Sequence, residues 1–251
     1  MSARRELDSL LGAISFFTRL KVPGREGHSD VALERAIRYF PAVGLLIGAI
    51  AAIVFVATSL IWPKTLALVA AIAAAIVVTG AIHEDGWSDM VDGFGGGANR
   101  DKVLAIMRDS ALGSYGALAL ALLIVARFFA LLEINAALLP VALIAGHAVS
   151  RLCATFVLGA LDYARAEGKA KPFANRLGRG ELVFATLCAL APLVFLPPWS
   201  ALAGLLLALL ATFWLARMFK RRIGGYTGDC LGATQQLAEI AFYCGLLCRF
   251  S

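Results

Sequence analysis

Long apolar runs separated by shorter polar intervals dominate this chain of 251 residues. A helix needs about 20 mostly apolar residues to cross a bilayer, and most of the runs approach that length. No polar interval is longer than about 40 residues, which is too short for a separate soluble domain. The pattern predicts one all-α domain, residues 1–251, that crosses a membrane with about six or seven helices. The expected spans are residues 41–61, 65–82, 113–132, 136–161, 182–197, 200–216 and 233–248.

The first apolar run, residues 7–20, is too short to cross a bilayer. It is expected to lie in the membrane interface or to re-enter from one side. A signal peptide is not expected, because no small-residue cleavage site follows this run.

The composition agrees with a membrane protein. Hydrophobic residues make up 60% of the chain, and its mean hydropathy is +0.80. Five cysteines without a CxxC pair predict neither a disulfide framework nor a zinc site.

Lysine and arginine are distributed unevenly between the two sides that alternating spans define. One side receives the first 40 residues and the loops 84–112, 162–181 and 217–232, which hold 19 of the 23 Lys and Arg residues. This asymmetry is what the positive-inside rule expects of cytoplasmic segments. The net charge of +6 is then explained by topology and by the anionic headgroups of the lipid bilayer, so nucleic acid is not an expected partner.

The densest polar stretch, residues 83–116, lies between two apolar runs and contains six of the 17 acidic residues. Asp85, Asp89 and Asp92 are spaced i, i+4, i+7, so on a helix they share one face. They would extend over about 10 Å, which leaves room for one or two divalent cations about 4 Å apart. Negative charge beside hydrocarbon is costly unless a cation binds it, so this face is a predicted Mg²⁺ site. A merely solvated acidic helix followed by a flexible loop is the alternative.

Glycines and basic residues follow the acidic face. Gly95, Gly96 and Gly97 are expected to end the helix and to let backbone N–H groups approach an anion. A second helix, residues 99–109, then delivers Asp109 before the next span begins. Carboxylates for metal, glycines for backbone approach and cations for phosphate together suggest phosphoryl transfer or diphosphate chemistry. The candidates for binding phosphate oxygens are Arg100, Lys102, Arg108 and Ser110.

A second polar stretch, residues 224–232, lies on the same predicted side and contains four glycines. Its aspartate, Asp229, could complete a metal site or contact a ribose hydroxyl. A loop that only ends a helix is equally compatible with this spacing.

Three ionisable residues, Arg127, His147 and Arg151, fall inside apolar spans. Such groups usually face the bundle interior and a partner, here the acidic site or a bound diphosphate, and Arg151 is the stronger candidate. An internal ion pair, or a side chain that snorkels toward the cytoplasm, is the alternative. His83, beside Glu84, is either a proton acceptor or an interfacial histidine.

These residues carry a resemblance to a known family. The central pattern H-x-DG-x-x-D-x-x-DG-x-GGG, followed by a basic segment and IM-[RK]-DS-x-x-G-x-YG, is matched here from His83 to Gly116. The chain resembles the cobalamin synthase family, the adenosylcobinamide-GDP ribazoletransferases, over nearly its whole length. Glu84 departs from the pattern, where an apolar residue is expected, and it adds a further candidate metal ligand. Flanking matches are Phe17-Thr18-Arg19-Leu20, Tyr39-Phe40-Pro41 and Gly225-Tyr226-Thr227-Gly228-Asp229.

The resemblance implies a Mg²⁺-dependent transferase of the bacterial inner membrane with its active site facing the cytoplasm. The ribose hydroxyl of α-ribazole, or of its 5′-phosphate, attacks the cobinamide-linked phosphorus of adenosylcobinamide-GDP, and GMP leaves. The product is adenosylcobalamin or its 5′-phosphate, and homo-oligomers or complexes with other cobalamin-assembly enzymes are possible.

The resemblance also implies roles for particular residues. Mg²⁺ is expected on Asp85, Asp89 and Asp92. Asp109 is the first candidate for general base or second metal ligand, and His83 is the next. The remaining candidates are Arg108, with Arg100 or Lys102, for phosphate oxygens, and Arg151, Thr227 and Asp229 for substrate.

Two other classes compete with this interpretation. A CDP-alcohol phosphotransferase also uses clustered aspartates, but its DG-x-x-AR spacing is not matched, because Gly86 is followed by Trp87-Ser88-Asp89. A divalent-cation transporter would carry acidic residues along the spans on both sides of the midplane, whereas Glu133 and Glu239 are the main exceptions to a cytoplasmic distribution.

Overall fold

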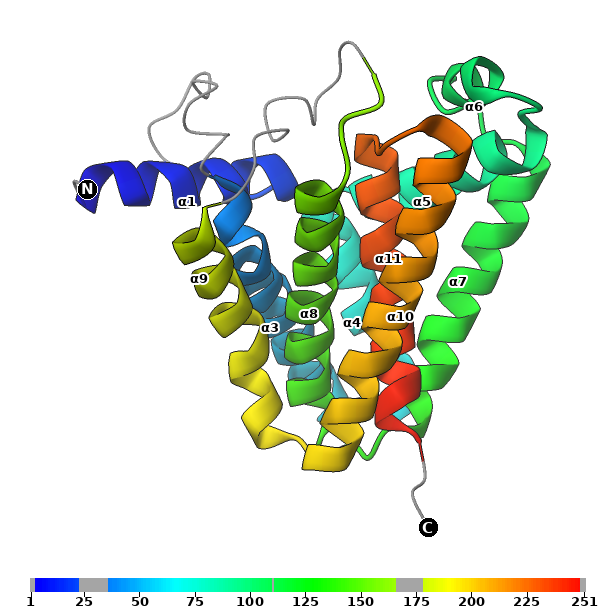
Figure 1. Ribbon diagram of the computed structural model, residues 1–251. Helices are drawn as coiled ribbons and strands as arrows, with labels where there is room; N and C mark the ends of the chain where they lie inside the picture. Colours follow the sequence, from blue (N-terminus) through cyan, green and yellow to red (C-terminus); the bar gives the residue numbers. More distant parts are fainter. Residues whose placement is uncertain (1–2, 23–35, 110, 166–177, 249–251) are drawn as a thin grey trace.

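The computed structural model describes residues 3–22, 36–109, 111–165 and 178–248 (Figure 1). This part of the chain contains helices and no named strand, so the all-α prediction is confirmed. Every expected span coincides with helix. The helices of the bundle are α3 (Phe40–Ser59), α4 (Lys64–Thr79), α7 (Ser114–Glu133), α8 (Leu139–Ala160), α9 (Arg179–Leu190), α10 (Pro198–Ile223) and α11 (Gly228–Leu246), with 3-10 helices η1 (Ile37–Tyr39) and η3 (Ala191–Phe195).

Length and apolarity support fewer crossings than the six or seven expected. In the described residues, four helices are long and apolar enough to cross a membrane: α3 with η1, α7, α8 and α10. A fifth crossing is counted if α4 and the helix that follows it, bent by 85°, form one broken span. The difference has two causes: α9 has only 12 residues, and α11 carries buried polar side chains at Gln235, Gln236 and Glu239.

The outer helices present apolar side chains to their surroundings. Leu118, Leu122 and Phe129 on α7 are largely exposed, as are Leu206 and Phe213 on α10. Such a surface suits lipid and would be unfavourable in water, which agrees with a protein that crosses a bilayer several times.

The inner helices approach one another through small residues. A Cβ atom added at Gly48 of α3 would lie 2.6 Å from Ile144 Cα of α8, and one at Gly245 of α11 would overlap Gly204 of α10. Within a bilayer the hydrophobic effect does not drive helices together, because lipid tails are as apolar as the side chains. Close backbone approach instead stabilises the packing through van der Waals contact.

Three helices lie at one end of the bundle: α1 (Ala3–Phe17), α5 (Ile82–Gly96) and α6 (Arg100–Ile106) (Figure 1). α1 lies across this end, as expected of a helix in a membrane interface. The turn from α4 into α5 uses left-handed backbone at Gly80 (φ 64°) and Ala81 (φ 59°). This break turns the acidic segment away from the axis of α4 and places it at the same end as α1.

Candidate active site

The acidic face of α5 lies against the start of α11. A Cβ atom added at Gly86 would lie 3.0 Å from Asp229 Cα and 3.0 Å from Asp229 O, so any larger residue would push against the backbone of α11. Gly232, one turn further along α11, packs against the backbone of His83 in the same way. The crossing brings Asp229 beside Asp85 and Asp89, although it is far from them in sequence.

The environment of this group raises the pKa of two of its carboxyls, Asp89 and Asp229. Burial, and then the charges of Asp85, Asp229 and Asp92, raise the pKa of Asp89 to about 7. Burial also raises the pKa of Asp229, against the opposing effect of Arg165. Neighbouring carboxylates repel one another when they are ionised, and a bound cation would offset this repulsion.

Arg165 is the cation that the structure places at the group. Its guanidinium lies 2.9 Å from Asp229 Oδ2 and 3.3 Å from the carbonyl oxygen of Met107, to which it donates. The segment before it is aligned with the start of α11 by hydrogen bonds from Ala164 N to Tyr226 O (2.8 Å) and from Tyr226 N to Asp162 O (2.9 Å). Sequence reasoning missed Arg165, because nothing distinguishes it from the other basic residues of its loop.

The donor set suits Mg²⁺ without forming a complete cage. Among the described residues, no group of three or more His, Cys, Asp or Glu side chains is arranged to hold a metal ion. Mg²⁺ does not need one, since it keeps several waters and is commonly bound by one or two carboxylates and the phosphates of a substrate. Asp85 and Asp89, with Asp229 opposite, supply oxygen donors of this type.

Asp92, predicted as a metal ligand, makes contacts that its spacing does not reveal. Its two carboxylate oxygens accept hydrogen bonds from Gly113 N (2.8 Å) and Gly116 N (2.8 Å) at the start of α7. A Cβ atom at either glycine would overlap the carboxylate. Asp92 therefore caps α7, where a negative charge also interacts favourably with the helix dipole.

Asp92→Asn should lower the stability of the protein in metal-free buffer by about 1–2 kcal/mol, because Asn has one acceptor oxygen and no charge to offer α7. The thermal unfolding midpoint in detergent with EDTA measures this effect. Asp101→Asn removes the same charge from the first turn of α6, where the side chain is exposed and accepts no backbone hydrogen bond among the described residues, and should lower the midpoint much less. An Asp92→Asn protein as stable as the wild type would show that the cap contributes nothing.

The Glu84 side chain points into the bundle interior and contacts Arg127 and Gln236, although it was predicted to bind a metal ion. Its Oε1 lies 3.3 Å from Arg127 Nη1 and accepts a hydrogen bond from Gln236 Nε2 at 3.0 Å. Arg127 also contacts Gln236 Oε1 and lies 3.6 Å from Glu239. Because adjacent helical residues point in different directions, Glu84 and Asp85 contact different partners.

The other ionisable residues of the spans join the same interior network. His147 Nδ1 lies 3.0 Å from Glu239 Oε2, and Gln235 donates to that oxygen at 2.6 Å. Arg151 donates to the carbonyl oxygen of His147 at 2.9 Å, and its buried Nε has no hydrogen-bond partner in the described structure. Arg127 thus takes the internal ion-pair role, His147 contacts Glu239 in the same network, and Arg151 also reaches the cavity described below.

The glycine-rich segment is helical, not a loop. α5 continues through Gly96, and Gly97 is its C-cap, so the expectation that these glycines end the helix is confirmed. A Cβ atom at Gly97 would lie 2.7 Å from Val103 Cα. These glycines let α6 fold back on α5, and Gly95 is covered by Tyr115 at a Cβ distance of 3.0 Å.

Arg100 is committed to a structural contact. It donates to the carbonyl oxygens of Ile223 (3.0 Å) and Ala164 (2.8 Å). Arg222 makes the reciprocal contact, donating to the carbonyl oxygens of Phe94 (3.0 Å) and Gly97 (2.8 Å). The pair joins α5 and α6 to the end of α10.

The remaining predicted residues lie near this end of the bundle. Lys102 and Arg108 are exposed, and Asp109 is exposed with its Oδ1 accepting from Ala111 N at 3.1 Å. Ser110 lies outside the described residues. Thr227 is the N-cap of α11: its hydroxyl accepts from Cys230 N and contacts Asp229 Oδ2, both at 3.3 Å.

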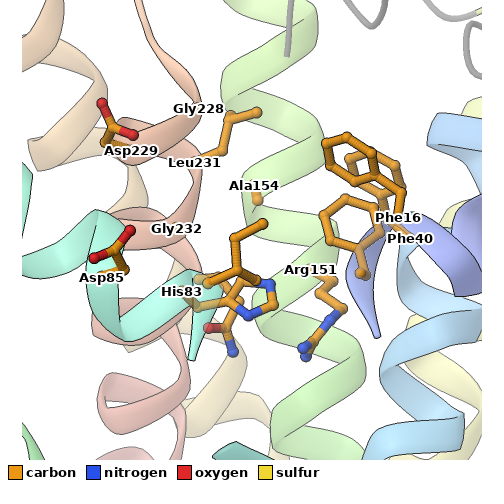
Figure 2. Close-up of a pocket in the computed structure, with 13 residues that line it drawn as sticks. Phe16, Phe40, His83, Asp85, Arg151, Ala154, Gly228, Asp229, Leu231 and Gly232 are labelled. Carbon is orange, nitrogen blue, oxygen red and sulfur yellow. The ribbon is translucent and has the colours of Figure 1, made fainter. Parts of the chain in front are cut away.

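A cavity of about 150 Å³ opens beside the acidic group (Figure 2). Phe16, Phe17 and Phe40 form an aromatic wall from α1 and α3, in which the Phe17 and Phe40 rings lie 4.3 Å apart. Asp85 and Asp229 lie on the other side of the cavity. The wall was not predicted, because its members belong to segments whose contact no local pattern reveals.

His83 and Arg151 line the same cavity (Figure 2). The His83 ring stacks on Phe17 with centroids 6.0 Å apart. Burial, and then the positive charge of Arg151, lower the pKa of His83 well below its ordinary value, so the imidazole is neutral. Asp109, the first candidate for general base, does not line the cavity.

Comparison with known proteins identifies the family. Residues 9–247 match the cobalamin-5-phosphate synthase family. This chain belongs to that family. It is 41% identical to the adenosylcobinamide-GDP ribazoletransferase of Ralstonia pickettii (strain 12J), over 100% of both chains. It is 42% identical to the enzyme of the same description from Shewanella amazonensis, over 99% of this chain and 98% of the relative. No solved structure matches the chain.

Proposed function

We propose that the protein joins adenosylcobinamide-GDP to α-ribazole, or to its 5′-phosphate, and releases GMP. The curated relatives that share its full length are described as adenosylcobinamide-GDP ribazoletransferases. The observation that carries the proposal is the cavity, which has an aromatic wall on one side and two carboxylates on the other, with His83 between them.

The aromatic wall suits a flat heteroaromatic nucleoside. A ring stacked on Phe16, Phe17 or Phe40 loses apolar surface to the protein and gains favourable ring contacts. Its ribose would then extend toward His83 and the acidic group. This arrangement would bring a hydroxyl of the acceptor close to His83, Asp85 and Asp229.

His83 is the proposed proton acceptor. The acceptor hydroxyl transfers its proton to the neutral imidazole as its oxygen forms a bond to the cobinamide-linked phosphorus. The bond between that phosphorus and the oxygen of GMP breaks, and GMP leaves with the bonding pair. Arg151, at the floor of the cavity with an unpaired Nε, supplies positive charge for phosphate oxygens.

Asp85 and Asp89 are the residues proposed to hold Mg²⁺, with Asp229 adjoining them. The ion would supply charge neutralisation for the diphosphate and for the leaving GMP. Arg165, 2.9 Å from Asp229 Oδ2, would keep that carboxylate in place. The proposed orientation puts this end of the bundle in the cytoplasm of a bacterial inner membrane, as the distribution of Lys and Arg favours.

The test uses purified protein in detergent with adenosylcobinamide-GDP, either acceptor and Mg²⁺. GMP and a new corrinoid product should form in equal amounts, EDTA should abolish both, and excess Mg²⁺ should restore them. The acceptor-free reaction is the control for simple hydrolysis of the donor. If folded protein forms no product with either acceptor, the proposal fails, and CDP-diacylglycerol with an alcohol acceptor becomes the next assay.

A further inference from the structure

A second hollow, of about 520 Å³, adjoins the cavity and shares Phe16, Ile82 and Asp85 with it. The rest of its lining is mostly polar and comes from two segments: the turn after α1 and the break between α4 and α5. The residues that these segments contribute are Thr18, Arg19, Thr79, Gly80 and Ala81. None of these five is used by the proposed reaction.

Two charged residues line this hollow, Asp85 and Arg19, and Arg19 is the positively charged one. Its backbone N–H donates to the carbonyl oxygen of Val78 at 2.7 Å, so the turn after α1 is fixed to the end of α4. Its side chain lies against Gly80, where an added Cβ atom would overlap it. Arg19 is exposed, and among the described residues no carboxylate lies within ion-pair distance of its guanidinium.

The backbone around Arg19 is held in an unusual conformation. Among the described residues, Ala81 is the only non-glycine residue with positive φ, at 59°, a conformation that costs free energy and that surrounding structure must maintain. Gly80, at φ 64°, leaves the space that the Arg19 side chain occupies. The same turn directs the first residues of α5 at the hollow, where the helix dipole favours an anion.

We propose that this hollow binds a phosphate group of a substrate and that Arg19 is its ligand. The inference rests on the proposed function and extends it by assigning a phosphate site next to the cavity in which the nucleoside is proposed to bind. Asp85 lines both hollows, so a phosphate held by Arg19 would lie next to the cavity and its acidic group. The carboxylate alone would repel that phosphate, and the cation proposed on Asp85 and Asp89 would offset the repulsion.

Two substrate phosphates have the required chemistry. One is the 5′-phosphate of a phosphorylated acceptor whose base lies in the aromatic cavity. The other is the diphosphate of the donor. A guanidinium recognises either in the same way, through charge-assisted hydrogen bonds to the phosphate oxygens.

Arg19→Gln, measured with α-ribazole, α-ribazole 5′-phosphate and adenosylcobinamide-GDP varied in turn, separates the two sources. A rise in KM of about 10-fold or more for the phosphorylated acceptor alone would assign the hollow to the 5′-phosphate. The same rise for the donor, with either acceptor, would assign it to the diphosphate. Equilibrium titration with α-ribazole 5′-phosphate and with GDP should show the matching loss of affinity without turnover.

Lys21→Gln is the matched control. It removes one positive charge two residues away, at an exposed position that does not line the hollow, and should leave both KM values unchanged. Unchanged KM and Kd values in folded Arg19→Gln protein overturn the inference, as does an equal loss in Lys21→Gln, which would indicate only general surface charge. Failure of the wild-type protein to form any product would instead contradict the proposed function.

Discussion

Replacing Asp89 by Asn should lower the rate of GMP release by about 100-fold or more while the protein stays folded. Removing one preorganised electrostatic contribution from an active site typically costs this much. Asp89 is the most strongly affected member of the acidic group, with a pKa raised to about 7 by burial and then by its carboxylate neighbours. Asn would keep one oxygen but remove the negative charge of a proposed metal ligand and, at the same time, relieve repulsion in the metal-free protein.

These two consequences have opposite signs, which makes the measurement specific. The thermal unfolding midpoint of Asp89→Asn in EDTA should equal or exceed that of the wild type, whereas its activity collapses. The concentration of Mg²⁺ that gives half the maximal rate should also rise. Asp101→Asn, a loss of the same charge at an exposed position on α6, should change neither the rate of GMP release nor the Mg²⁺ concentration for half the maximal rate. An Asp89→Asn protein that folds and keeps full activity would remove the metal assignment.

The bundle could be predicted because membrane insertion imposes a local rule. A segment that is apolar over enough residues becomes a helix, whatever it later packs against, so each expected span coincides with helix in the structure. The number of crossings was harder to predict. It depends on whether other helices cover short or polar helices such as α9 and α11, and a hydropathy profile contains no information on tertiary contacts.

The acidic site was partly predictable for the same reason. Helical spacing is enough to place Asp85 and Asp89 on one face of α5. It is not enough to show that Asp92, one turn further, has its oxygens occupied by the backbone of α7. The aromatic wall and Arg165 lie on segments far from α5 in sequence, so no local spacing reveals that they reach the site. The approach of Asp229 to α5 likewise depends on close packing at Gly86, which only the folded chain shows.

Arg127→Met should destabilise the protein by about 3–5 kcal/mol, the usual cost of leaving a buried charge without its partner. Arg127 is almost completely buried and lies between the carboxylates of Glu84 and Glu239, at 3.3 and 3.6 Å. Without it the two carboxylates remain in the bundle interior, where Glu84 retains only the amide of Gln236. The thermal unfolding midpoint in detergent measures the loss, and Arg217→Met, at an exposed position on α10, is the matched control.

Adding Glu84→Gln to Arg127→Met should recover part of the lost stability, because the double variant removes the unpaired carboxylate together with the guanidinium. An additive effect of the two substitutions would show that this pair is not energetically coupled. Activity should fall in Arg127→Met even where the protein remains folded. Glu84 immediately precedes Asp85 on α5, so the ion pair that holds Glu84 in the bundle interior also sets the position of the acidic face. The buried network and the candidate active site are therefore two sides of one helix, and a charge removed from one side should be detected as lost catalysis on the other.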